Sequence, residues 1–438
     1  MSKLSSATIW LAGIQWLFFI FANTVVVPLS VGAAFDLQPE EIAASLQRSF
    51  IFTGAASILQ AVAGHRYALM EGPAGLWWGL ILSLCASAPS VGMSLTTIGG
   101  GLATGILLAG LTTVLLGAMG FANILKKVFT PIVMSVYLFL LSSQLVMIFL
   151  KGMLGLSNDN ELDLPIAALS IVTAILVGLL SIKGRGLIGD FSILIGMVMG
   201  WIAYNFLFPV EKAVTISTES SISWFPWGTP NLELGIIITA FLAGLINMTN
   251  TIAAVSATEK LYQTTTTDQQ YKRTFLLTGV YTIVAAVLGL VPYGPYTSSI
   301  GLLESTRILE RLALVIGGAL FVILGLVPAL GALFTMIPIS IGSAVLFVAY
   351  LQLFGTALRT IEGIHFNSKT IYRIAAPTLL GLCIMNISPE VFATIPMYIR
   401  PLVSNGLLMG VLLALVLESF VNWSKYELLD SRKNKQSI

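Results

Sequence analysis

The sequence predicts an all-α polytopic membrane protein with about fourteen transmembrane segments. Of its 438 residues, 56% are hydrophobic and 10% are charged, and the mean hydropathy is +0.92. A soluble domain of this length would need more polar side chains to cover its surface. The apolar runs repeatedly reach the roughly 20 residues that a helix needs to cross about 30 Å of hydrocarbon.

Seven segments are expected in the first half, each bounded by charged residues or by Pro and Gly. The first begins near Thr8 and is too long for the apolar part of a typical cleaved signal, so we interpret it as a membrane helix. The third is short and is interrupted by Gly and Pro. The expected ranges are 8–32, 45–63, 68–86, 98–119, 126–150, 165–182 and 187–208.

Seven more segments are expected after the long loop at about 209–233. The first two are joined by a polar stretch that contains four successive threonines. The tenth segment of the chain is short and irregular, like the third. The expected ranges are 234–257, 273–291, 296–309, 311–333, 336–358, 371–388 and 401–422, followed by a basic tail at 424–438.

Positively charged loops predict the orientation of the chain. Cytoplasmic loops carry an excess of Lys and Arg, and with the N-terminus inside most of these residues fall on the cytoplasmic side. The sequence thus predicts a multi-pass protein of the plasma membrane with both termini in the cytoplasm. The inside residues include Lys126, Lys127, Lys183, Arg185, Lys272, Arg273 and Arg373, and the acidic Asp159, Glu161 and Asp163 fall outside.

Composition also excludes several function classes. The net charge of +2 and the lack of a basic patch argue against a nucleic-acid partner. Cys85 and Cys383 lie in apolar stretches, which indicates buried thiols, and His65 and His365 fall in predicted loops. No metal site and no metal or organic cofactor is therefore expected. The sequence shows no hydrolase or metalloprotease motif at membrane depth, so the chain is not expected to be an enzyme.

Two interrupted segments at corresponding positions point to a solute pathway. The third segment contains Glu71-Gly72-Pro73-Ala74-Gly75, and the tenth contains Pro292 to Gly301. Non-helical backbone at membrane depth is tolerated only where it is buried in protein or lines a watery cavity. Paired breaks of this kind mark the binding sites of transporters. Each would be an extended stretch that leads into a half-helix with free N–H groups; two simple packing kinks are the alternative.

Polar side chains near these breaks are the candidate substrate ligands. Asn247 and Asn250 are three residues apart and therefore share one face of the eighth segment. Amides buried at that depth need partners, either in neighbouring helices or in the solute. Asn23 in the first segment is a candidate substrate ligand for the same reason. Ser298 and Ser299 could either cap the tenth half-helix or bind solute.

Glu71 stands at the break of the third segment and is the candidate carrier of a coupling proton. Ionisable residues inside membrane segments mark ion and proton pathways. The alternative is a glutamate at the edge of a loop, close to His65 and Arg66.

Several motifs resemble those of the nucleobase–ascorbate transporter family, the uracil and xanthine permeases, over essentially the whole chain. Gln15 to Leu29 is similar to the opening motif of the family, with Trp16 in place of its usual histidine. Val128 to Met134 is similar to the fifth-segment element, and Ile337 to Ala344 to the twelfth.

The family signature is a Glu or Gln, then Asn, any residue, Gly, four residues and Thr. It corresponds here to Ser298 through Arg307, with Gly301, Thr306 and Arg307 at the expected spacing. The chain departs from the pattern at the two carboxylates that hold the base in related permeases, which are Asn250 and Ser298 here. An asparagine can still donate to and accept from a base edge, but it cannot carry a proton.

The resemblance implies an inverted repeat of seven plus seven segments, with short strands and half-helices in segments 3 and 10. A core domain would comprise 1–120 and 234–334, and a gate domain 121–233 and 335–423, before the tail at 424–438. It further implies a small-molecule nucleobase as the partner within the lipid bilayer, a proton as the coupling ion, and a homodimer. With Asn250 and Ser298 uncharged, Glu71 is the leading coupling residue.

We therefore expect a nucleobase permease, for a purine of the xanthine, urate or guanine class, that works by alternating access. Asn250, Ser298 and Ser299 would bind the base edge, with backbone groups near Gly75 and Thr297. The aromatic residues Trp77, Tyr293 and Tyr296 are candidates for stacking. Two alternatives are an inorganic-anion or carboxylate transporter of the same architecture and a transport-inactive sensor or scaffold.

Overall fold

The protein is mostly helical in the computed structural model, which describes residues 5–121, 128–155, 162–184, 187–209, 223–329, 336–364, 366–421 and 423. The first half contains α1 (Ser6–Thr24), α2 (Val26–Ala34), α3 (Pro39–Val62), β1 (Glu71–Pro73), α4 (Gly75–Val91), α5 (Leu95–Met119), α7 (Pro131–Met153), α8 (Leu164–Lys183), α9 (Leu187–Asp190) and α10 (Ser192–Leu207).

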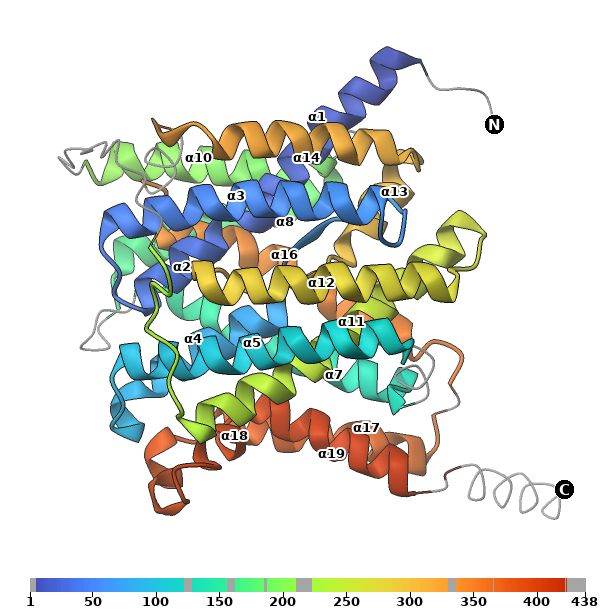
Figure 1. The fold of residues 1–438 in the computed structure, drawn as a ribbon. Helices are drawn as coiled ribbons and strands as arrows, with labels where there is room; N and C mark the ends of the chain where they lie inside the picture. Colours follow the sequence, from blue (N-terminus) through green and yellow to red (C-terminus); the bar gives the residue numbers. More distant parts are fainter. Residues whose placement is uncertain are drawn as a thin grey trace, which may run out of the picture.

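The second half contains α11 (Leu234–Tyr262), α12 (Asp268–Leu288), β2 (Tyr293–Pro295), α13 (Ser298–Thr306), α14 (Arg311–Gly325), α16 (Ile339–Thr360), α17 (Ser368–Met385), the 3-10 helix η1 (Pro389–Thr394), α18 (Arg400–Val403) and α19 (Gly406–Phe420). Figure 1 shows these helices running roughly parallel to one another.

Each of the fourteen expected ranges contains a helix of the structure, although several helices begin earlier than expected. Among the described residues, seven helices are long and apolar enough to cross a membrane. Helix α12 begins at Asp268 and not near Arg273, because Thr267 and Gln270 form a capping box ahead of the apolar run. Helix α3 begins at Pro39, with Glu40 and Glu41 in its first turn. Apolar runs locate the membrane-embedded part of a helix and miss such polar extensions.

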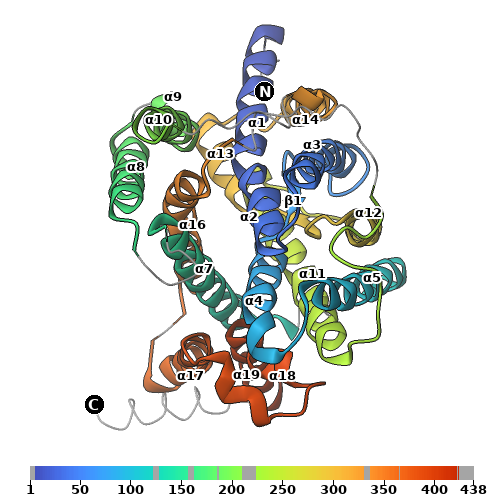
Figure 2. The ribbon, with the colours of Figure 1, turned by 90° about the vertical axis from the view of Figure 1, so that its left-hand side faces the viewer.

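The helices gather into two packed groups, which Figure 2 shows in a view along their axes. Helices α3, α5, α11, α12 and α14 pack together, with α1 against α14. Helices α7, α8, α10 and α16 form the second group, and α19 and α17 pack on α7. The first group comes from 1–120 and 234–334, and the second from the intervening and following ranges.

The two strands lie side by side in the interior, where they form an antiparallel pair. Glu71 stands opposite Pro295, and Gly72 opposite Gly294. The Ala74 N–H donates to the Pro292 carbonyl over 2.8 Å, and the Tyr296 N–H donates to the Met70 carbonyl over 2.9 Å. The pairing joins segments that are more than two hundred residues apart, and all six strand residues are buried. The short strands expected in segments 3 and 10 are present.

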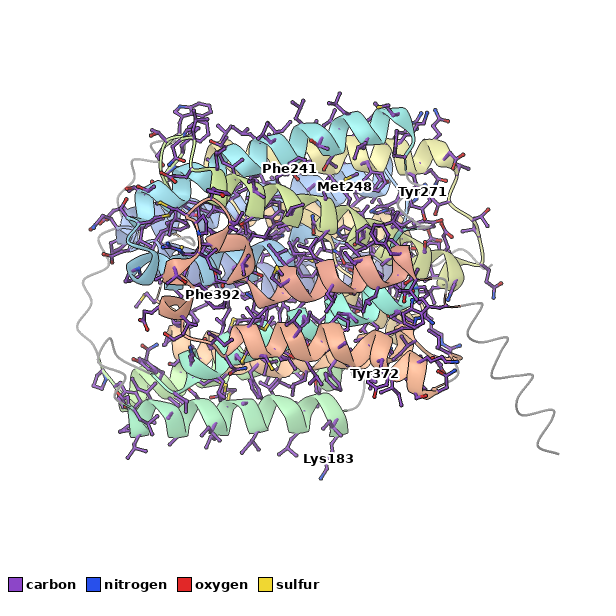
Figure 3. The ribbon with its side chains drawn as sticks, turned by 90° about the horizontal axis from the view of Figure 1, so that it is seen from below. Lys183, Phe241, Met248, Tyr271, Tyr372 and Phe392 are labelled. Carbon is purple, nitrogen blue, oxygen red and sulfur yellow. The ribbon has the colours of Figure 1, made fainter. Side chains whose placement is uncertain are left out.

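Basic and aromatic residues mark the two ends of the bundle. Lys183, Tyr271 and Tyr372 lie toward one end in Figure 3, and Phe392 lies toward the other. Helix α1 begins and α19 ends at that first end (Figure 1). Of the residues used to predict orientation and loops, the following are outside the described residues: Lys126, Lys127, Arg185, Asp159, Glu161, His365 and the tail at 424–438.

The two cysteines differ in burial. Cys85 on α4 is buried, as expected, whereas Cys383 on α17 is exposed, which corrects the expectation of two buried thiols. Apolar sequence alone does not distinguish a core face from a face that meets lipid, and Leu379 and Leu380 on the same helix are also exposed.

Candidate functional site

A cavity of ≈ 390 Å³ lies where the two strands lead into their half-helices. One wall comes from α1, α4, α11 and α13, and the other from α7 and α16, with α8 to α10 at one side. Seven of the sequence-predicted residues line it: Asn23, Gly75, Asn250, Tyr296, Thr297, Ser298 and Gly301. The remaining predicted site residues, Asn247, Ser299, Glu71, Thr306 and Arg307, are not part of this lining.

Both half-helices, α4 and α13, begin at the cavity. Neither helix has a side-chain hydrogen bond at its N-cap, Ala74 for α4 and Thr297 for α13. The first turn of a helix leaves its N–H groups without intrahelical partners and carries a partial positive charge. Gly75 and Ser298, the first residues of the two helices, both line the cavity. The cavity therefore meets the N-terminal ends of both half-helices, although the second and third N–H groups of α13 already donate to backbone carbonyls just before them.

Asn250 and Asn247 anchor strand β2, each through a backbone carbonyl. The Asn250 side-chain amide donates to the Pro295 carbonyl over 3.2 Å, and the Asn247 amide donates to the Tyr293 carbonyl over 3.0 Å. Both lie on the same face of α11, as their spacing predicts. They differ in what else they reach, because Asn250 lines the cavity whereas Asn247 is 4% exposed and buried behind the strand.

Ser298 and Ser299 likewise divide between the cavity and the protein interior. Ser298 lines the cavity. Ser299 is fully buried, and its hydroxyl accepts a hydrogen bond from the Met70 N–H over 3.2 Å. Ser299 thus fixes α13 to the chain that enters β1, and its hydroxyl lies away from the cavity.

Asn23 lies where α1 ends and α2 begins. Its side-chain amide donates to the Phe19 carbonyl over 2.9 Å. The Tyr296 hydroxyl donates to the Pro73 carbonyl over 2.5 Å and approaches the Asn23 carbonyl at 3.3 Å. One phenol therefore ties the first helix to both strands at the cavity wall.

Glu71 is fully buried in β1, next to the cavity lining but not within it. The Thr278 hydroxyl donates to its Oε1 over 2.8 Å, and its Oε2 has no hydrogen-bond partner among the described residues. Its backbone N–H donates to the Ser57 hydroxyl over 3.1 Å. Neither of the ion pairs found in the described part of the chain involves Glu71.

The signature residues of the tenth segment end the half-helix and shape its cavity side. A Cβ atom at Gly301 would meet nothing within 4 Å, so this glycine leaves space open beside Ser298. The Thr306 hydroxyl donates to the Leu302 carbonyl over 2.8 Å. Arg307 is the C-cap of α13 with a left-handed φ of 55°. Thr306 and Arg307 therefore shape the helix end and lie outside the cavity.

Both walls of the cavity contain aromatic residues that sequence reasoning missed. Tyr137 on α7, Tyr350 on α16 and Phe19 on α1 line the cavity together with Tyr296. Of the expected stacking residues, Trp77 and Tyr293 are buried elsewhere. Tyrosines inside otherwise apolar segments were the available signal, since buried phenols need polar partners. No group of three or more His, Cys, Asp or Glu that could hold a metal occurs within the described ranges.

Comparisons with known proteins agree on one family. Residues 7–390 match the model of the "Permease family" (Xan_ur_permease). The chain is 25% identical over 410 residues to the nucleobase transporter PlUacP of Paenibacillus larvae, covering 92% of both chains. It is 25% identical over 419 residues to the xanthine permease of Bacillus subtilis, covering 94% of this chain and 93% of that one.

A solved structure supports the fold. The transmembrane domain of the cyanobacterial bicarbonate transporter BicA matches with a TM-score of 0.62 at 14% identity, over 94% of this chain and 98% of that domain. At this identity the likeness concerns the architecture alone.

Proposed function

Because the chain belongs to the xanthine and uracil permease family, whose members are transporters and not enzymes, we propose that it carries a purine base across the plasma membrane. The observation that carries the proposal is the cavity of ≈ 390 Å³ at the meeting point of α4, α13 and Asn250. Its size falls in the range of about 300–1,000 Å³ that is usual for small-molecule sites. Relatives named for nucleobases and for xanthine support a base as the solute.

The cavity groups suit the edge of a planar base. Asn250 keeps its side-chain oxygen and one N–H available beyond the bond to Pro295, and Ser298 can both donate and accept. The first N–H groups of α4 and the Ser298 N–H of α13 add donors. Tyr137, Tyr296 and Tyr350 give the walls aromatic surface against which a base can pack. Asn250 and Ser298 together bind the base edge in this proposal.

Transport follows from the position of the cavity between two packed groups. We take 1–120 with 234–334 as a core domain and 121–233 with 335–423 as a gate domain, related by a seven-plus-seven inverted repeat. The antiparallel pairing of β1 with β2, each followed by a half-helix, supports this symmetry. Alternating access would then come from movement of the core against the gate.

A proton on Glu71 would couple transport to the proton gradient. Burying a carboxylate without a cationic partner is costly, and the side chains that hydrogen-bond to the Glu71 carboxyl group, Thr278 and Gln60, are both neutral. This environment favours the neutral acid, so Glu71 can take up a proton and release it when its surroundings change. Cytoplasmic termini and a homodimer complete the proposal.

Uptake of radiolabelled purines by permease-deficient cells tests the function. Wild type should accumulate a purine, and Asn250→Ala combined with Ser298→Ala should lower uptake at least about tenfold, equivalent to ~1.4 kcal/mol. Asn386→Ala, at the exposed end of α17, is the matched control and should transport normally. Undiminished uptake by the double variant would remove the site assignment.

Two further measurements separate the alternatives. Bicarbonate or sulfate competing with the purine would favour an anion transporter of this architecture. A purine that raises the thermal stability of the purified protein without any uptake would favour a sensor.

A further inference from the structure

A second, much smaller cavity lies behind strand β2, between α4, α5, α11 and α12. Its polar lining comes from Trp77, Asn247, Thr278, Thr282 and Thr113. It offers ≈ 10 Å³ to the centre of a water molecule, close to the about 10–15 Å³ that a single buried water requires. The cavity is separate from the proposed substrate site and shares no lining residue with it.

Two orphaned polar atoms belong to residues that line this cavity. The Trp77 indole N–H and the Asn247 side-chain oxygen have no hydrogen-bond partner among the described residues, and these residues are 1% and 4% exposed. Leaving such atoms unpaired is unfavourable, because each has lost its hydrogen bonds to water without replacement. One is a donor and the other an acceptor, which a single water can satisfy together. A cation is a poorer occupant, because the indole N–H presents positive charge and no carboxylate lines the cavity.

Thr278 connects the cavity to Glu71. Its hydroxyl donates to Glu71 Oε1 over 2.8 Å and accepts from the Gln60 amide over 3.0 Å. The same Gln60 amide lies 3.2 Å from the Thr274 carbonyl, an obligate acceptor, which fixes the orientation of the amide. One lone pair of the Thr278 oxygen therefore remains available to a water in the cavity.

We propose that this cavity holds one ordered water and that the Thr278 hydroxyl reverses its hydrogen bond when Glu71 takes up a proton. With Glu71 ionised, Thr278 donates to the carboxylate and accepts from the water. When a proton from solvent binds a Glu71 oxygen, the new O–H donates to the Thr278 oxygen. The Thr278 hydroxyl hydrogen then rotates to donate to the water, and no covalent bond of Thr278 breaks. The inference rests on the proposed proton-coupled transport.

The water passes this change to the strand that borders the substrate. A water that accepts from Trp77 and Thr278 donates to the Asn247 oxygen, whose amide holds the Tyr293 carbonyl of β2. Trp77, Asn247 and Thr278 are thus positioning residues, which act through β2 on the cavity that contains Asn250.

Few titratable groups compete with Glu71 for this role. Those that interact with it among the described residues are the phenols of Tyr281 on α12 and Tyr293 on β2. Helix α3 presents Gln60 and Ser57, which do not titrate, and α1 contains no charged residue. The remaining charged residues of α12, Asp268, Lys272 and Arg273, lie in its first two turns.

The test is the pH profile of purine uptake in Thr278→Val, which keeps the side-chain shape and removes the hydroxyl. We expect uptake no longer to rise on acidification, while purine affinity in thermal-shift titrations stays within about threefold, or ~0.6 kcal/mol. Thr278→Ser should restore the pH dependence. Thr113→Val is the matched control, because this hydroxyl lines the same cavity but already donates to the Ala109 carbonyl over 2.8 Å.

Trp77→Phe is the second variant and decides the matter if Thr278→Val does not fold. It keeps most of the ring and removes the indole N–H, so it should also flatten the pH profile. If acid stimulates transport by the wild type and the variants keep that stimulation, the proposed role of the water and of Thr278 is wrong, and the transport function is unaffected. Wild type that neither binds nor transports purines would instead overturn the proposed function. If uptake by the wild type does not depend on pH, both proton coupling and the proposed role of the water and of Thr278 are wrong.

Discussion

The Asn250 side-chain amide donates to the Pro295 carbonyl over 3.2 Å, so one residue holds strand β2 and also lines the proposed substrate cavity. Asn247 holds the same strand at Tyr293 over 3.0 Å but does not reach that cavity. The two asparagines therefore form a natural pair for separating the stability of the strand from recognition of the solute.

Replacing each asparagine by leucine should give different results. Both Asn250→Leu and Asn247→Leu remove a donor to a β2 carbonyl, which should lower the free energy of unfolding by about 1–3 kcal/mol. Asn250→Leu should also weaken purine binding at least about tenfold, and Asn247→Leu should weaken it far less. Thermal unfolding and ligand titration of the purified proteins measure the two effects. Equal losses of affinity would contradict the distinction.

Gly301 controls how much room the cavity has beside Ser298. A Cβ there would meet nothing within 4 Å, so a larger side chain can extend into the cavity without disturbing the packing. Gly301→Leu should abolish purine binding while leaving the melting temperature nearly unchanged. Gly355→Leu is the matched control, because Gly355 on α16 also has open space at its Cβ but does not line the cavity. Retained binding in Gly301→Leu would place the solute elsewhere.

The sequence predicted the elements of the fold because hydropathy and Pro/Gly breaks report local preferences. The extended stretches at Glu71–Pro73 and Tyr293–Pro295 were expected from their Gly and Pro residues. The family resemblance implied a short strand in each segment, and the antiparallel pairing of the two strands comes from the structure, since contacts between distant segments leave no local pattern. Cys383 shows the limit of hydropathy, because a lipid-facing position is as apolar as a buried one.

The candidate site was predictable on the side of the strands and half-helices and not on the opposite side. Gly75 and Ser298 stand at visible breaks in apolar segments, and Asn250 is a polar residue within an apolar segment. Tyr137 and Tyr350 come from unbroken helices, where a tyrosine in an apolar run indicates a phenol that needs a polar partner but not whether that partner lies in a cavity. Which of Ser298 and Ser299 faces the cavity depends on how α13 is oriented about its own axis, and residue spacing alone does not predict that orientation.

Close helix packing depends on particular glycines, of which Gly99 on α5 is the clearest. A Cβ at Gly99 would lie 1.9 Å from the Trp227 carbonyl oxygen, a backbone atom that cannot move aside alone. Gly99→Ala should therefore destabilise the protein by about 1–3 kcal/mol, the usual effect of overpacking. Gly178→Ala on α8, where a Cβ meets nothing within 4 Å, should be neutral or slightly stabilising. Similar melting temperatures for the two variants would contradict this packing.

His65 should make the protein sensitive to acid through a group outside the helices. It follows the end of α3, is fully buried, and accepts a hydrogen bond at Nδ1 from the Tyr67 N–H over 3.1 Å. Its other ring nitrogen has no hydrogen-bond partner among the described residues. Burial in this apolar setting lowers the pKa of His65 from 6.5 to about 3, because the charged imidazolium loses its hydration.

The sign of the effect follows from this lowered pKa. Above the unfolded value of 6.5 the ring is neutral in both states, and its contribution to stability is fully present. As the pH falls from 6.5 toward about 3, the unfolded chain binds a proton that the native protein excludes, so the native state loses stability. One unit below the unfolded pKa, the loss should be about 1.4 kcal/mol. His65→Gln should remove this acid-dependent loss in thermal unfolding followed across the same pH range, since glutamine does not titrate. Wild type and His65→Gln that lose stability in parallel on acidification would show that other groups titrate instead.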